Sequence, residues 1–203
     1  KRFLVRIVAT EEYARNFAEG KIFMNSLGYY RALGIDQFGK GAYRGDVTEG
    51  LSGYISEGKF EVQIGDTKLA KTDLCGPLVY RRDSLLNLNA LCLFSMMFPR
   101  TKKETVHEIH EGFQIPRHMR EFGDYVVIFC NPNEVIKRIA VAATAQGFEL
   151  KHGAVRYNDD PDDIGILTAD EVGLCKPGRY REQSEYRILV NLKSKDPTPL
   201  ILD

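Results

Sequence analysis

Residues 181–192 read REQSEYRILVNL, and this stretch decides both the fold class and the position of the candidate site. Side chains on a β-strand alternate between its two faces. Gln183, Glu185 and Arg187 are therefore expected to share one face of a late strand. The other face is apolar and predicts a core strand; it carries Tyr186, Ile188 and Val190. The polar face is either exposed to water or lines a cleft.

Length and charge set the class of protein. A chain of 203 residues fits a single globular domain over residues 1–203, and 43% hydrophobic residues are enough for a sizeable core. Lys plus Arg and Asp plus Glu are equal at 28 each. This balance gives no overall charge that would favour nucleic acid or a membrane surface as a partner.

The N-terminal residues KRFLVRIVATEE lack an apolar segment long enough for a signal peptide, and no apolar run has the length of a membrane span. We therefore expect a cytoplasmic protein. The cysteines Cys75, Cys92, Cys130 and Cys175 lie far apart in the sequence. Two of them, Cys92 and Cys130, sit in apolar runs, which indicates buried, reduced thiols.

Strand patterns outnumber helix patterns along the chain. Helices are predicted from Thr10 to Gly20 and from Asn131 to Gly147, because each has an N-cap residue, acidic residues in the first turn and a terminal glycine. The remaining patterns predict strands at residues 2–9, 21–27, 59–65, 67–70, 77–82, 90–98, 123–130, 148–157 and 184–192. We predict an α+β fold with a mainly antiparallel, bent or split sheet and a few flanking helices.

Two segments interrupt this pattern. Residues 31–53 are rich in glycine and charge and predict a long loop, and loops of this length in compact domains are often functional. Residues 99–123 predict an irregular excursion with a short helix.

Short motifs exclude several common site classes. His107 and His110 have the wrong spacing for an H-E-x-x-H zinc helix, so a solvated helix face that includes Glu111 is preferred and no metal site is predicted. The acidic run at 158–165 lacks calcium-loop spacing and is interpreted as a turn. The glycines of 39–50 match no phosphate-binding loop.

Arg6 is unusual because it lies in the middle of an apolar strand. Arginine is seldom buried without a partner. The side chain either extends to solvent from an edge strand or reaches a buried or ligand anion, and its planar fork suits a pyrophosphate.

Three separate pieces together resemble a known arrangement. An Arg on the first strand (Arg6), a Ser on the second (Ser26) and Gln-x-Glu at the start of a late strand (Gln183, Glu185) are similar to the Arg–Ser–(Gln/Glu)-x-Glu pattern of the ADP-ribosyltransferase-like superfamily. The resemblance implies a split, mainly antiparallel sheet whose cleft binds NAD as substrate. The family's Ser is usually followed by Thr-Ser; here Leu27 and Gly28 follow it.

The resemblance also implies a role for each residue. Arg6 would hold the phosphates or a ribose, Ser26 would brace the glutamate and the nicotinamide side, and Glu185 would be the catalytic carboxylate. A carboxylate that contacts the ribose 2′-hydroxyl stabilises the positive charge that develops when the nicotinamide–ribose bond breaks. Gln183 would orient the accepting group, and Tyr29 or Tyr30 would stack on nicotinamide.

A second resemblance covers more of the chain. The segments GKIFMNSLGYYR, RGDVTEG, LCLFSM, FGDYVVIFCNPNEVIKRI and KPGRYREQSEYRILV resemble a group of phage and bacterial proteins to which no activity is assigned. It implies that several residues converge on one cleft, namely Tyr30, Arg31, Arg44, Asp46, Glu49, Tyr180 and Glu185. For RGDVTEG the alternative is a simple turn in which Asp46 caps backbone N–H groups.

These patterns lead to two hypotheses. The first is a mono-ADP-ribosyltransferase or NAD-cleaving enzyme, acting in a cleft between the first, second and last strands, with a macromolecule as acceptor of the transferred group. The second is a non-catalytic phage or host-defence-related protein that binds a nucleotide signal or a protein partner. In the second, Glu185 forms a structural ion pair with Arg6 or Arg187.

Overall fold

The computed structural model describes residues 2–36, 45–69, 75–97, 115–160, 162–193 and 198–202. Within these ranges the strands are β1 (Arg2–Val8), β2 (Ile22–Ser26), β3 (Gly53–Ile55), β4 (Gln63–Ile64), β5 (Thr67–Lys68), β6 (Leu78–Tyr80), β7 (Asn89–Met97), β8 (Tyr125–Phe129), β9 (Glu149–Ala154), β10 (Arg156–Tyr157), β11 (Gly165–Ile166), β12 (Cys175–Lys176), β13 (Glu185–Asn191) and β14 (Leu200–Leu202). The α-helices are α1 (Glu11–Ala18), α2 (Leu27–Asp36) and α4 (Pro132–Ala145), and the 3₁₀ helices are η2 (Asp83–Asn87), η3 (Arg117–Phe122) and η4 (Gly178–Gln183).

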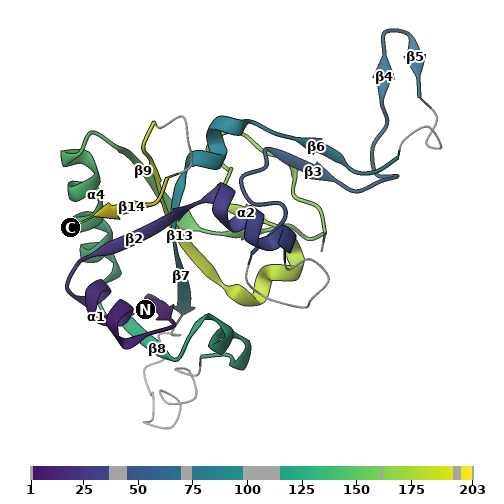
Figure 1. The fold of residues 1–203 in the computed structure, drawn as a ribbon. Coiled ribbons are helices and arrows are strands. Elements are labelled where there is room, and N and C mark those ends of the chain that lie inside the picture. The colour runs from purple at the N-terminus through teal and green to yellow at the C-terminus, as the bar shows by residue number, and fades with distance from the viewer. Residues whose placement is uncertain are drawn as a thin grey trace, which may run out of the picture.

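A seven-stranded antiparallel sheet forms the body of the molecule (Figure 1). One path through it runs β14-β2-β7-β1-β8, and β13 pairs with the other edge of β7 and then with β9. The strands β3, β6 and β11 form a separate small sheet, and the β4–β5 hairpin projects away from the body beyond them (Figure 1). The predicted α+β class with a mainly antiparallel, curled sheet is confirmed.

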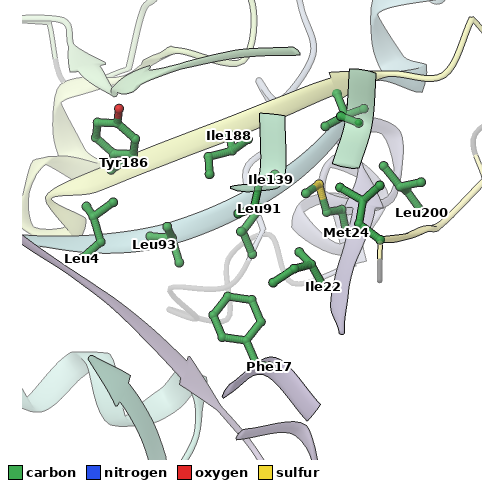
Figure 2. Packing of buried hydrophobic residues seen from close by; sticks show 13 residues of the cluster. Leu4, Phe17, Ile22, Met24, Leu91, Leu93, Ile139, Tyr186, Ile188 and Leu200 are labelled. Atoms are coloured by element: carbon green, nitrogen blue, oxygen red, sulfur yellow. The ribbon is translucent and has the colours of Figure 1, made fainter. Parts of the chain in front are cut away.

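The sheet buries a different apolar cluster on each face. On one face, Leu4, Leu91 and Ile188 pack against α1 and α4 (Figure 2). The three residues predicted to form the core face of the last strand are all buried in this cluster: Tyr186, Ile188 and Val190. The opposite face holds two further clusters, one around Leu27 and Leu189 and one around Val5 and Phe94.

Local sequence signals set the ends of two helices. Thr10 accepts a hydrogen bond from the Tyr13 N–H and caps α1, and Asn131 accepts one from the Glu134 N–H and caps α4. Both N-caps are as predicted. All four cysteines are unpaired, but Cys130 is exposed rather than buried, because it lies beyond the end of β8 and next to the α4 cap.

The predicted loop over residues 31–53 begins later than expected. Residues 31–36 are helical, because Ser26 ends β2 and its Oγ accepts the Tyr29 N–H, which caps α2. Gly34, which suggested a loop, instead allows a close contact, because a Cβ there would lie 2.6 Å from the Asp46 backbone nitrogen. Residues 37–44 lie outside the described ranges, as does most of the predicted excursion; its described part includes η3.

The paired strands β7 and β13 carry most of the core, so a cavity there should be costly. Ile188→Ala removes a side chain with no exposed surface, and we expect it to lower the free energy of unfolding by about 2–5 kcal/mol. Val141→Ala on α4, where the side chain is 62% exposed, is the control and should change it by less than about 0.5 kcal/mol. Denaturant titration measures both. Equal effects would contradict this assignment of the core.

Candidate functional site

The site begins at an opening in the main sheet. One edge of β7 pairs with β13 from Asn89 to Phe94. The other edge pairs with β2 at Asn89 and Ala90 and with β1 from Phe94 onward. Within the described chain, residues 91–93 have no strand partner on that edge, because β1 and β2 diverge there. The predicted split of the sheet therefore lies between the first and second strands.

Arg6 fills part of this opening. Its Nη1 donates a 2.7 Å hydrogen bond to the carbonyl oxygen of Cys92, on the unpaired stretch of β7. Strand alternation sends Arg6 out on the face of Leu4 and Glu185 out on the opposite face. Both nevertheless line the same cavity, because that cavity passes through the separation between the strands.

A cavity of about 840 Å³ occupies the opening. It is lined by parts of β1, β2, α2, β7 and β13 and by the turn at residues 45–49. Three aromatic side chains around it are about half exposed, namely Tyr13, Phe23 and Tyr29. The volume lies within the range of small-molecule sites, which are about 300–1,000 Å³.

Arg187 lies at the wall of this cavity and is 2% exposed. It forms a bidentate pair with Glu49, at 2.8 Å from Nη1 and 2.6 Å from Nη2. Its Nε and Nη2 donate to the two carboxylate oxygens of Glu185 at 3.0 and 3.1 Å, and Nη1 also donates to the Gly173 carbonyl at 2.8 Å. All five N–H groups of the guanidinium are therefore hydrogen-bonded.

Lys176 is the second cation of this cluster. Its Nζ lies 2.9 Å from Glu185 Oε2 and 3.5 Å from Glu49 Oε1, and it donates a 2.8 Å hydrogen bond to Gln183 Oε1. Two buried acids thus face two buried bases. We call the four charged residues Glu49, Lys176, Glu185 and Arg187 the ion cluster. Its formal charge sums to zero.

The ion cluster fixes the ionisation of its members. Burial acts to raise the pKa of Glu185, but the charges of Arg187 and Lys176 outweigh it and hold that pKa well below its usual range. Burial likewise acts to lower the pKa of Arg187, and Glu185 and Glu49 more than offset it. Glu185 is therefore a carboxylate throughout the neutral range.

Asp46 lies beside the ion cluster, and its pKa is shifted in the direction opposite to that of Glu185. Burial and the nearby charge of Glu49 raise its pKa. Its Oδ1 accepts hydrogen bonds from the Thr48 N–H at 2.8 Å and the Thr48 hydroxyl at 2.7 Å, so Asp46 does cap the turn, as the simpler interpretation of RGDVTEG expected. Asp46 and Glu49 also line the cavity, so the turn supplies both a cap and cavity wall.

Gln183 does not lie on the last strand, contrary to the prediction. It is the final residue of η4, and Ser184 follows with φ 42°, in the left-handed region. Ser184 turns the chain, its hydroxyl donates to the Ser95 carbonyl, and the strand begins at Glu185. Gln183 still lines the cavity, but it connects to Glu185 through Lys176 rather than through strand alternation.

The other predicted site residues divide into two groups. Tyr29, Tyr30, Asp46 and Glu49 line the cavity with Arg6 and Glu185. Ser26 is 3% exposed, caps α2 and is not part of the lining, and Arg31 donates to the Val47 carbonyl outside it. Tyr180, on η4, is also outside the lining, with its ring centroid 5.2 Å from Lys176 Nζ. Arg44 lies outside the described residues.

Sequence reasoning missed Lys176, Cys92 and Phe23, all of which line the cavity. Cys92 and Phe23 follow from strand alternation once the strand pairing is known. Lys176 lies in the two-residue strand β12, which has no periodic pattern to identify it. The sequence shows only a lysine between Cys175 and Pro177. Lysine is seldom buried unless it is paired, so nothing in the sequence indicates that this one is buried.

Neither a metal cluster nor a membrane span emerges from the described residues. No group of three or more His, Cys, Asp or Glu side chains among them could hold a metal ion, and His107, His110 and Glu111 are not in the described ranges. No helix in these ranges is long and apolar enough to cross a bilayer. No protein-family model, curated protein or solved structure matches the chain.

The low pKa of Glu185 predicts a pH-dependent stability difference. The folded-state pKa is depressed, so the stabilisation is complete above the unfolded-state pKa of about 4.3 and is lost as the pH falls through the folded-state value. At pH 7, Glu185→Gln should lower the free energy of unfolding by about 3–5 kcal/mol, because Lys176 and Arg187 lose a buried partner.

Denaturant titrations of wild type and Glu185→Gln at pH 7, 5, 4 and 3 measure this difference. It should shrink steadily below pH about 4. A difference that is absent at pH 7, or that stays constant down to pH 3, would contradict the ion cluster as described.

Proposed function

We propose that the cavity binds a nucleotide whose phosphate lies on Arg6. Four cationic side chains line the cavity: Arg6, Lys21, Lys176 and Arg187. Lys21 pairs with Glu19, and Lys176 and Arg187 pair with the acids of the ion cluster. Among the described residues, Arg6 alone of the four has no carboxylate at ion-pair distance. This single observation carries the proposal.

The guanidinium geometry supports a phosphate ligand. One nitrogen of Arg6 is used by the Cys92 carbonyl, which fixes the side chain in the opening. The remaining N–H groups form the fork that binds phosphate oxygens in bidentate geometry. The half-exposed rings of Phe23 and Tyr29 at the same cavity suit stacking on a nucleobase. NAD, the ligand implied by the superfamily resemblance, is one such nucleotide.

Arg6→Ala should therefore abolish nucleotide binding without unfolding the protein. In a thermal-shift screen, NAD, ADP-ribose and ADP should each raise the melting temperature of the wild type. A ligand present at 100 times its Kd stabilises the folded state by about 2.7 kcal/mol. Arg6→Ala should remove the shift for every ligand. Arg138→Ala, on the exposed side of α4, is the control and should keep it. An unchanged shift in Arg6→Ala would exclude this phosphate site.

Cleavage of the nicotinamide–ribose bond is the second candidate function, and ionised Glu185 on the cavity wall favours it. The bond between the ribose C1′ and the nicotinamide nitrogen breaks, and its electron pair leaves with nicotinamide. A carboxylate stabilises the positive charge that develops on the ribose. Water or a macromolecular acceptor then forms the new bond to C1′ and loses a proton.

The contacts of Glu185 support the non-catalytic alternative instead. Both of its carboxylate oxygens accept hydrogen bonds from Arg187, and Oε2 also contacts Lys176. A carboxylate held in this way is typical of a structural ion pair, which is the role expected in a phage or host-defence-related protein that only binds a nucleotide signal or a protein partner.

Nicotinamide release separates the two candidates. Wild type is incubated with NAD, and nicotinamide is followed by chromatography at a temperature where all variants are folded. A catalytic Glu185 predicts that Glu185→Gln loses turnover about 100-fold or more. Glu49→Gln, which removes one acid from the same Arg187, should lower stability but keep most of the turnover. No release by wild type, or equal losses in both variants, would leave only the binding function.

A further inference from the structure

Asp46 has one carboxyl oxygen that the protein leaves without a partner. The side chain is 1% exposed, and its Oδ1 accepts hydrogen bonds from the N–H and the hydroxyl of Thr48. Its Oδ2 is buried too, but no group among the residues that the structure describes bonds to it. A buried polar atom without a hydrogen bond costs free energy, so each such atom in a folded protein calls for an explanation.

Capping of the turn does not explain the second oxygen. A serine hydroxyl can accept the same backbone N–H, so a cap needs only one oxygen. Asp163 makes the same kind of cap elsewhere, because its Oδ1 accepts from the N–H of Ser56 at 2.8 Å and from the Ser56 hydroxyl. Its Oδ2, however, pairs with Lys59 Nζ at 3.2 Å. Asp46 lines the cavity and Asp163 does not, so a ligand in the cavity can be the partner that Asp46 lacks.

The backbone of Asp46 places it where α2 meets the ion cluster. The turn packs closely on α2, since a Cβ on Gly34 would lie 2.6 Å from the Asp46 nitrogen. Gly34 follows Tyr29, the ring proposed to stack on the nucleobase, by little more than one helical turn. On the other side, the Glu49 N–H donates to the Asp46 carbonyl at 3.0 Å. This is the part of the cavity next to the proposed position of the base, where the sugar of a nucleotide would lie.

We propose that Asp46 Oδ2 hydrogen-bonds a sugar hydroxyl of the nucleotide whose phosphate lies on Arg6. A hydroxyl can donate to a carboxylate and accept from a carboxylic acid, so it fits Oδ2 in either ionisation state. A phosphate oxygen would instead be repelled by a carboxylate. This inference rests on the proposed function, and it specifies the ligand as a ribonucleotide and Asp46 as a specificity-determining residue.

The first test changes the ligand and leaves the protein intact. ADP, 2′-deoxy-ADP and 3′-deoxy-ADP are titrated into the wild type by calorimetry. At least one of the deoxy ligands should bind about fivefold or more weakly than ADP, which is the effect of one lost hydrogen bond. Equal affinities for all three ligands would overturn the inference. That result would leave the nucleotide function intact, because all three ligands carry the phosphate that Arg6 is proposed to bind.

The second test changes the oxygen on the protein. Asp46→Ser keeps an oxygen that can cap the turn and removes Oδ2. It should weaken ADP by the same factor and should bind ADP and the affected deoxy ligand equally. Asp163→Ser is the matched control, because it alters the same kind of cap outside the cavity and should keep the preference for ADP. A preference that survives in Asp46→Ser, or that is lost in Asp163→Ser, would overturn the inference.

Thermal denaturation separates a ligand contact from a structural one. Without ligand, Asp46→Ser should melt close to the wild-type temperature, because the oxygen it removes bonds nothing in the described part of the protein. A fall in melting temperature as large as that of Glu185→Gln would show a structural role and overturn the inference. Arg6→Ala should abolish binding of all three ligands. Failure of the wild type to bind any of them would overturn both this inference and the proposed function.

Discussion

The buried guanidinium of Arg187 holds together three segments that lie far apart in the sequence. It bonds Glu185 on its own strand, Glu49 in the turn after α2 and the carbonyl of Gly173. A charge at 2% exposure is tolerated only with such complete pairing. The position of the turn, of η4 and of β12 relative to β13 depends on this contact, so the wall of the cavity is built around it.

The same contact bears on the proposed binding of an anion in a cavity with an acidic lining. Glu49 and Glu185 are neutralised by Arg187 and Lys176, and burial raises the pKa of Asp46. Among the residues that the structure describes, Arg6 is then the one cation of the lining without an acid at ion-pair distance. The proposed preference for an anion therefore depends on this local arrangement of charges and not on the overall composition of 28 acidic and 28 basic residues.

The opening itself follows from how strands share an edge. β7 is nine residues long and β1 and β2 each pair with only one end of its edge. The carbonyl of Cys92 between them needs a partner, because buried backbone groups are almost always hydrogen-bonded. Arg6 supplies that partner. Its charged end therefore lies in the opening between the strands and not among the apolar side chains on the same face of β1. The hydrogen bond between Arg6 and Cys92 thus satisfies both a carbonyl without a strand partner and a guanidinium that extends from an apolar strand.

The sequence by itself determined the features that depend on near neighbours: the alternating faces of residues 185–190, the caps at Thr10 and Asn131, and the α+β class. It also drew attention to Arg6, Asp46, Glu49 and Glu185, because charges in apolar strands and polar turns are conspicuous. Only the tertiary structure decided that the strand begins after Ser184 and excludes Gln183, that Ser26 caps α2 and is not part of the cavity lining, and that Lys176 completes the ion cluster. These outcomes depend on strand pairing and on contacts between residues distant in the chain, which leave no periodic signal in the sequence.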